Sequence, residues 1–296
     1  MTHTPTVHIV MVNCNGKAVT LACLETLVKV KYPAWKVTLI DNGSTDGSVQ
    51  AIRATYPDVD ILTMEANLGW ARAANVGIRH VLEQGAELVL LLNNDTLLDP
   101  NFLDALVAVT VDKPDVGFVA PKIYYADEPT RLWSAGAAVS MWLGMTWHIG
   151  IRERDHGQYD TPREIPLATG CCILVRRELI EHVGLLDESY YMYTEDADWI
   201  MRARRAGYKV FYEPRAKIWH RLSVDTGGHL SFRKNKYKFL GIYRFFSRYA
   251  SWYHWLVFPW MTLLANGFVA VRYLLGRIVR AIDNRLFGIG ATIHDT

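Results

Sequence analysis

The chain has 296 residues, enough for one large domain or for a domain with a sizeable appendage. Half of the residues are hydrophobic and 21% are charged, which predicts a packed core and excludes a disordered chain. The formal net charge of +2 offers no general basis for binding nucleic acid.

The four cysteines do not have the paired spacing of a zinc site. They are Cys14, Cys23, Cys171 and Cys172. We therefore expect reduced thiols in a cytoplasmic protein. The N-terminus lacks a basic segment followed by a long apolar one, so we expect no signal peptide.

The first half of the chain alternates strand-like and helix-like segments. Short apolar runs predict strands at 8–12, 36–40, 60–64 and 87–92. Helical spacing of apolar residues predicts helices at 17–30, 48–55 and 71–83. This alternation predicts an α/β fold with a mostly parallel sheet flanked by helices.

The second half has a less regular pattern. Residues 121–150 indicate loops or short strands, and 165–175 indicates a strand interrupted at Gly170. Helices are expected at 178–184 and at 196–206, where Gly207 ends the second helix. A short strand is expected at 208–213.

Polar clusters follow three of the expected strands. They are Asn13-Cys14-Asn15, Asp41-Asn42-Gly43-Ser44 and Asn93-Asn94-Asp95. In parallel sheets, ligands bind beyond the carboxyl ends of the strands. The alternative is that these polar residues only form the turns that follow the strands and bind no ligand.

Two common phosphate-binding loops are missing from the sequence. Neither a P-loop nor a GxGxxG motif follows any expected strand, so a nucleotide would need carboxylates and a divalent cation. Asp95 is the best candidate because it follows the most apolar strand, 88–92. A cation between Asp95 and a diphosphate would neutralise a leaving group. The alternative is that Asp95 only forms a turn or a helix cap.

Four motifs in order resemble the family 2 glycosyltransferases of the GT-A fold, and among them the bacterial rhamnosyltransferase-like branch. The motifs are DNGSTDGS at 41–48, NLGWARAAN at 67–75, LNND at 92–95 and YTEDADW at 193–199. The resemblance covers roughly residues 7–240. It implies a GT-A catalytic domain over 1–240, with a nucleotide-sugar half at about 1–120 and an acceptor half at about 121–240.

The resemblance implies a nucleotide-sugar site formed by Asn13, Asp41, Asn42, Ser44, Asp46, Asn67, Arg72, Asn75, Asn94 and Asp95. Asp41 would accept a hydrogen bond from the N3–H of uracil or thymine, because a carboxylate accepts but cannot donate. Asp46 and Arg72 would hold the ribose and phosphate region, although Arg72 could equally be an ordinary surface residue.

The same resemblance implies a divalent cation. Asp95 matches the last residue of the DxD motif of the family, whereas Asn93 replaces the first Asp. His220 matches a position that coordinates the cation in relatives, and imidazole suits Mn²⁺ better than Mg²⁺. Either ion is therefore expected. A packed histidine at a strand end is the alternative for His220.

The resemblance places acid–base chemistry at Glu195 and Asp196. Asp196 would take the proton from the acceptor hydroxyl during inverting transfer. Glu195 would raise the pKa of Asp196 by repulsion, and the helix dipole would lower it, so the net direction stays open. Gly170, Cys171 and Trp199 are expected on the acceptor side. Arg233 ends a segment that either closes over the diphosphate or is an ordinary surface loop.

Aromatic and basic residues crowd residues 241–296. Residues 255–271 carry no formal charge, but 17 residues are short for a membrane span, and Pro259 and Asn266 interrupt them. The pattern favours a helical region at a membrane interface. Packing against the catalytic domain, a homo-oligomer contact and a true span are the alternatives. We therefore expect a peripheral protein on the inner face of the cell membrane.

Together these features predict an inverting glycosyltransferase that uses a dTDP- or UDP-sugar, with dTDP-rhamnose first. The expected acceptor is a cell-surface polysaccharide or a lipid-linked glycan. A nucleotidyltransferase is the alternative among enzymes, although no Gly-rich basic loop follows the first strand. An inactive carbohydrate-binding or scaffold protein is the alternative outside them.

Overall fold

The computed structural model describes residues 4–221, 232–257, 260 and 264. The contacts group the chain into two compact units. The first comprises Met1–Val139 and Thr146–Arg248, and the second comprises Ser140–Met145 and Tyr249–Thr296. The first unit contains the sheet and its helices.

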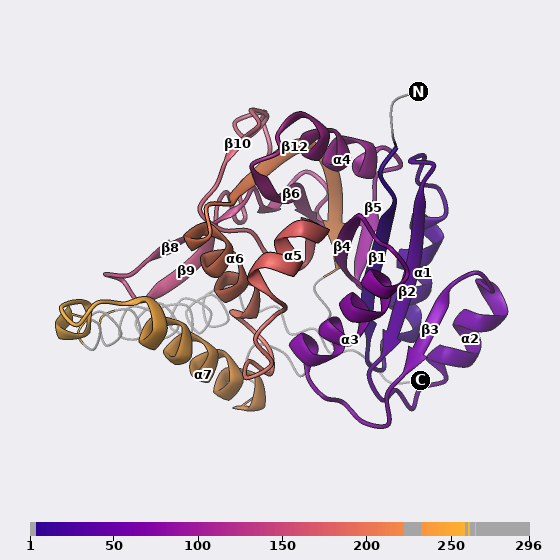
Figure 1. Ribbon diagram of the computed structural model, residues 1–296, viewed down its shortest axis with the longest axis horizontal. Coiled ribbons are helices and arrows are strands. Elements are labelled where there is room, and N and C mark those ends of the chain that lie inside the picture. Colours follow the sequence, from indigo (N-terminus) through magenta and orange to yellow (C-terminus); the bar gives the residue numbers. More distant parts are fainter. Residues whose placement is uncertain (1–3, 222–231, 258–259, 261–263, 265–296) are drawn as a thin grey trace, which may run out of the picture. The chain divides into compact units, whose positions relative to one another are not determined.

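Strands and helices alternate through the first part of the chain, as expected of an α/β fold, and β6 to β11 then follow one another without a helix (Figure 1). The strands are β1 (Val7–Asn13), β2 (Trp35–Asp41), β3 (Asp60–Thr63), β4 (Leu88–Asn93), β5 (Thr96–Leu98), β6 (Val116–Tyr125), β7 (Leu132–Ser134), β8 (Ala137–Ser140), β9 (Met145–His148), β10 (Arg163–Glu164), β11 (Cys172–Arg176) and β12 (Lys209–His220). The helices are α1 (Lys17–Leu27), α2 (Ser48–Thr55), α3 (Trp70–Glu83), α4 (Phe102–Asp112), α5 (Arg177–Val183), α6 (Glu195–Arg205) and α7 (Phe232–Tyr249).

The central sheet has the strand order β10-β12-β6-β11-β4-β1-β2-β3. Strands β3, β2, β1 and β4 are parallel, and β6 is parallel to β12. Strand β11 lies between β4 and β6 and runs antiparallel to both. The predicted mostly parallel sheet is therefore confirmed, although the short strand β10 also runs antiparallel to its neighbour β12. As a result β1, β2, β4 and β12 end at the same edge, where β11 begins.

Helices cover both faces of this sheet, which explains why most residues of β1 and β4 are apolar. Ile9 and Met11 join the core cluster that contains Leu24 of α1, whereas Val10 faces α3. Gly77 of α3 allows close packing, because a Cβ there would lie 2.5 Å from Val10 Cγ1. Burial on both faces requires apolar residues at consecutive positions of a strand.

The structure adds elements that the sequence pattern did not predict. Helix α4 is buried along one side, and β5 pairs with the last residues of β12. Strand β12 is much longer than the strand expected at 208–213. Its pairing with β6 shifts register between Glu213 and Lys217, next to Pro214, which has no amide hydrogen for the ladder. Beyond that irregularity, β12 continues to His220.

Helix α7 crosses the boundary expected at residue 240. Phe245 and Phe246 are buried, and the first unit extends to Arg248. Most of the uncharged stretch at 255–271 lies outside the described residues. Among the helices that the structure does describe, none has both the length and the apolar character required to cross a membrane.

Candidate active site

Asn13 is the centre of a hydrogen-bond network at the ends of β1, β2 and β4. Its side chain is fully buried, and its Nδ2 donates to Asp41 Oδ1 at 2.9 Å and to Ser44 Oγ at 3.0 Å. Its Oδ1 accepts from Asn94 Nδ2 at 3.1 Å and from Thr20 Oγ1 at 3.0 Å. The three polar clusters that follow β1, β2 and β4 are therefore in contact with one another.

Asn42 and Asn67 extend this network toward the start of α3. Asn42 Nδ2 donates to Asn67 Oδ1 at 3.1 Å, and Asn42 Oδ1 accepts the Leu68 amide at 2.9 Å. Asp46 lies at the other end, where its carboxylate accepts the amides of Lys17 and Ser48. Burial opposes the charge on Asp46, but these hydrogen bonds outweigh it and lower its pKa. Asp46 therefore ties the start of α1 to the start of α2.

Asp95 and His220 meet across the sheet edge, although 125 residues separate them. Asp95 Oδ1 lies 3.1 Å from His220 Nε2, and both side chains are largely buried. His220 reaches this position because it is the last residue of the long strand β12. Next to it, the Asp95 carbonyl accepts a hydrogen bond from the Arg221 amide at 2.8 Å. The pairing expected of two metal ligands is thus present in the geometry.

The residues around Asp95 fit a divalent cation. The buried His220 Nδ1 has no hydrogen-bond partner in the described part of the structure. Burial disfavours a charged His220 ring, but Cys171 and the Asp95 carboxylate favour it more and raise the pKa. No group of three or more ligating side chains occurs among the described residues. Two protein ligands suit an ion that substrate phosphates and water complete.

Asp196 lies in the first turn of α6, beside the turn that precedes β11. Its Oδ2 accepts the Gly170 amide at 2.7 Å, and its Oδ1 accepts the Ala197 amide at 2.7 Å. A Cβ on Gly170 would lie 3.4 Å from Asp196 Cβ and 3.2 Å from the Trp70 ring, which places this turn against the carboxylate. Because the Cys171 carbonyl accepts the Asn93 amide, the same turn adjoins the end of β4.

Glu195 and Asp196 are adjacent carboxyl groups whose negative charges would repel each other. Burial, followed by repulsion from Asp196, raises the pKa of Glu195 to about 8, and the buried Glu195 Oε2 has no hydrogen-bond partner among the residues that the structure describes. Burial also raises the pKa of Asp196, against the hydrogen bonds from the Gly170 and Ala197 amides. The two amides favour charge on Asp196, whereas burial and repulsion favour the neutral form of Glu195.

Other residues expected at the site have structural contacts. Arg72 pairs with Glu188 at 3.2 Å, and the buried Asn75 exchanges hydrogen bonds with Leu186. Trp199 is 1% exposed and donates to the Gly184 carbonyl, so it packs in the core and does not face an acceptor surface. Arg233 lies in the first turn of α7, and its side chain is outside the described part of the structure.

Three residues near the site carried no usable sequence signal. Thr20 binds both Asn13 and Asn94 through its hydroxyl. The Trp133 ring lies 4.6 Å from the His220 ring, centroid to centroid. Tyr191 donates to Asn67 Oδ1 at 3.0 Å across 124 residues of sequence. Each contact depends on distant segments meeting, which neither periodicity nor a short motif reveals.

Comparisons with known proteins agree with this geometry. The model of glycosyl transferase family 2 matches residues 8–184. The N-acetylglucosaminyl-diphospho-decaprenol L-rhamnosyltransferase of Mycobacterium tuberculosis is 32% identical over 243 residues, which cover 73% of this chain and 76% of the relative. The dTDP-rhamnosyl transferase RfbF of Shigella flexneri is 25% identical over 217 residues, covering 72% of this chain and 68% of the relative.

The fold has solved counterparts as well. The mannosyltransferase PcManGT from Pyrobaculum calidifontis, solved with GDP-Man and Mn²⁺, superposes with a TM-score of 0.61 at 19% identity and covers 95% of this chain and 81% of that one. The fold is therefore GT-A. The family model spans more than half of the chain, and the mycobacterial relative extends the similarity. This chain belongs to glycosyl transferase family 2 and is an enzyme that transfers a glycosyl group from a nucleotide sugar.

Proposed function

We propose that the enzyme is an inverting glycosyltransferase whose donor is dTDP-rhamnose, with a UDP-sugar as the alternative donor. The proposed acceptor is a hydroxyl of a lipid-linked glycan or a cell-surface polysaccharide. The observation that carries the proposal is the Asp196 carboxylate, which two backbone amides orient beside the end of β4. Similarity to two rhamnosyltransferases supports the choice of sugar, and one of them is named for a polyprenyl diphosphate acceptor.

Asp196 is the proposed general base. Each carboxylate oxygen accepts one backbone amide and keeps a second lone pair for the acceptor hydroxyl. The two amides favour the charged form of Asp196, which a base requires, beside a Glu195 whose pKa is raised to about 8. As the acceptor oxygen attacks the anomeric carbon, its proton passes to Asp196, and the nucleoside diphosphate leaves from the opposite side.

Donor recognition is assigned to the residues around Asn13, which form the nucleotide half of the domain at about 1–120. The buried Asp41 is fixed by Asn13 and by the Ser44 amide, so its carboxylate is oriented before the base arrives. Such preorganisation lowers the entropic cost of binding. The turn at Gly170 and Cys171 belongs to the proposed acceptor half at about 121–240.

A divalent cation, Mn²⁺ or Mg²⁺, would be held by Asp95 and His220. When bound, it would neutralise charge on the diphosphate leaving group. PcManGT, whose structure contains Mn²⁺, has the same fold, which supports this assignment. The contact between Asp95 Oδ1 and His220 Nε2 at 3.1 Å already brings the two proposed ligands together at the end of β12.

A thermal-shift screen of nucleotide sugars tests the proposal. We expect dTDP-rhamnose with Mn²⁺ or Mg²⁺ to raise Tm more than GDP-mannose does, because specific ligands stabilise the folded state by mass action. Asp95→Ala should remove the metal-dependent part of the shift, whereas Asp58→Asn on the surface should keep it. An equal or larger shift with GDP-mannose would contradict the assigned donor.

The second unit supports a peripheral membrane location. Trp252, Leu256, Trp260 and Leu264 recur at intervals of four residues, and each is at least 65% exposed. The tip at 140–145 contributes the exposed Trp142, whose ring contacts Tyr253 and His254. Between Asp225 and Asp283 the sequence has Lys and Arg but no acidic residue. Aromatic residues combined with positive charge suit an anionic lipid surface.

A further inference from the structure

Residues 187–194 connect the donor side of the site to Glu195. Helix α3 holds one side of this segment. Glu188 pairs with Arg72 at 3.2 Å and with Arg79 at 3.0 Å. The Trp70 amide donates to the Tyr191 carbonyl at 2.9 Å. The segment is therefore tied to α3 before it reaches the carboxyl pair.

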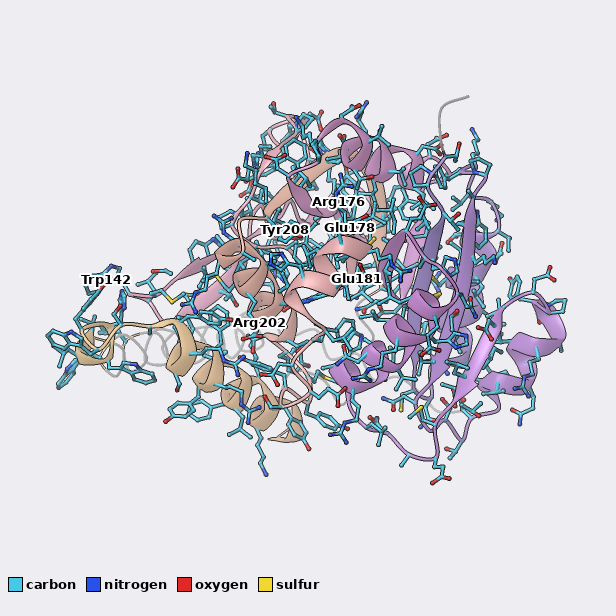
Figure 2. All side chains as sticks on the ribbon, in the orientation of Figure 1. Trp142, Arg176, Glu178, Glu181, Arg202 and Tyr208 are labelled. Atoms are coloured by element: carbon cyan, nitrogen blue, oxygen red, sulfur yellow. The ribbon has the colours of Figure 1, made fainter. Side chains whose placement is uncertain are left out.

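Helix α7 holds the same segment through Arg248. Arg248 Nη1 donates to Asp198 Oδ1 at 2.6 Å, and Nη2 donates to Asp187 Oδ2 at 2.8 Å. Asp198 is completely buried in the first turn of α6, and its other oxygen accepts from Arg202, labelled on α6 in Figure 2. One guanidinium thus joins the start of the segment to the helix that begins with the carboxyl pair. Charge-assisted hydrogen bonds to a buried carboxylate are strong and directional.

Further contacts from α7 follow along the segment. Arg244 donates to the Ser189 carbonyl and lies over the Tyr190 ring, 5.4 Å from its centroid. The Tyr237 ring stacks on Tyr191 at 4.3 Å. We call Tyr237, Gly241, Arg244 and Arg248 the α7 clamp.

Gly241 brings α7 against the two residues that precede Glu195. A Cβ at Gly241 would lie 2.6 Å from Thr194 Oγ1 and 2.7 Å from the Tyr193 carbonyl oxygen. Both residues are left-handed, with φ of 72° at Tyr193 and 65° at Thr194. Side chains other than glycine rarely adopt this conformation, so surrounding contacts must hold it.

We propose that Arg248 and Gly241 are positioning residues, through which α7 sets the placement of the Glu195–Asp196 pair. The inference rests on the proposed function, because it assumes that Asp196 is the base. Neither residue needs to touch the substrate. Arg248 acts through Asp198 and Asp187, and Gly241 acts through the Tyr193–Thr194 turn.

Arg248→Gln tests the first contact. Losing the guanidinium bridge should lower kcat on the order of tenfold or more, because small misplacements of a catalytic group are costly. The KM for the donor should stay near the wild-type value, since the residues around Asn13 are untouched. Arg79→Gln is the matched control, because it removes an ion pair to the same segment without contacting α6. Equal losses of kcat in both variants would overturn the proposal.

Gly241→Ala tests the second contact. This substitution should disturb the turn before Glu195 without weakening α7. Alanine is the better helix former, so α7 itself should be at least as helical by circular dichroism. The added methyl group must displace the Tyr193–Thr194 turn, and kcat should fall while donor affinity is kept. Wild-type kcat in Gly241→Ala would show that the close approach does not set the geometry.

Hydrogen–deuterium exchange tests the role of the α7 clamp independently of the proposal that Asp196 is the base. Peptides covering residues 187–197 should exchange faster in Arg248→Gln than in wild type or Arg79→Gln, since exchange reports local opening. That result supports the clamp even if Asp196→Asn remains active and the base assignment fails. Unchanged exchange in Arg248→Gln overturns the clamp, whatever the activity of the other variants.

Discussion

Asp196 combines two backbone hydrogen bonds with a position at the start of α6, an arrangement that favours the charged carboxylate and opposes the effect of burial on its pKa. Asp196→Asn should lower kcat by about 10²- to 10⁴-fold, because an amide cannot take up the acceptor proton. Donor affinity measured by calorimetry should stay close to wild type. Glu25→Gln, in an exposed surface pair, is the control. Loss of donor binding in Asp196→Asn would reassign the residue to the nucleotide site.

The raised pKa of Glu195 predicts how the free energy of unfolding depends on pH. Its folded pKa of about 8 lies above its ordinary value, so the folded state binds more protons than the unfolded state between those pH values. This contribution to stability is complete below the ordinary pKa and is lost as pH rises through about 8. Urea unfolding should show Glu195→Gln gaining stability relative to wild type from pH 6 to pH 9. A pH-independent difference would exclude a buried, protonated Glu195.

At the scale of elements, the packing of α3 onto β1 and β2 depends on Gly77. A Cβ there would lie 2.5 Å from Val10 Cγ1 and 3.0 Å from Ile40 Cγ1. Helix propensity alone predicts that Gly77→Ala stabilises by about 1 kcal/mol. Overpacking costs about 1–3 kcal/mol, so we expect a net loss of stability in urea unfolding. A more stable variant would mean that α3 can shift away from the sheet without cost.

Element prediction succeeded where burial and periodicity coincide. Helix α2 was predicted at about 48–55, and the structure has it at Ser48–Thr55. The length of β12 and the helix α4 were not predicted. Pro214 interrupts the strand pattern in the sequence, but pairing with β6 on one side and β5 on the other continues β12 to His220. Strands pair with segments that are distant in the sequence, so the local pattern of apolar residues does not predict how far a strand extends.

At the scale of the whole molecule, the exposed aromatic and apolar residues of the second unit predict binding to anionic membranes. The full-length enzyme should sediment with phosphatidylglycerol vesicles more than with phosphatidylcholine vesicles, and salt should weaken binding. Replacing Trp252, Leu256, Trp260 and Leu264 together by Ser should reduce sedimentation. Val28→Ser with Val111→Ser, which removes exposed apolar residues elsewhere, should not. Equal binding by the fourfold variant, or a change only in its oligomeric state, would contradict a lipid surface.

The sequence by itself determined the α/β class, the order of the first elements and the ends of β1, β2 and β4. These follow from apolar runs and turn residues that are adjacent in the chain. Four ordered motifs also indicated the family. Only the tertiary structure decided that Asp95 meets His220, that Trp199 lies in the core, and that α7 reaches the turn before Glu195. Those contacts join residues far apart in sequence, and their geometry depends on how the whole sheet and its helices pack.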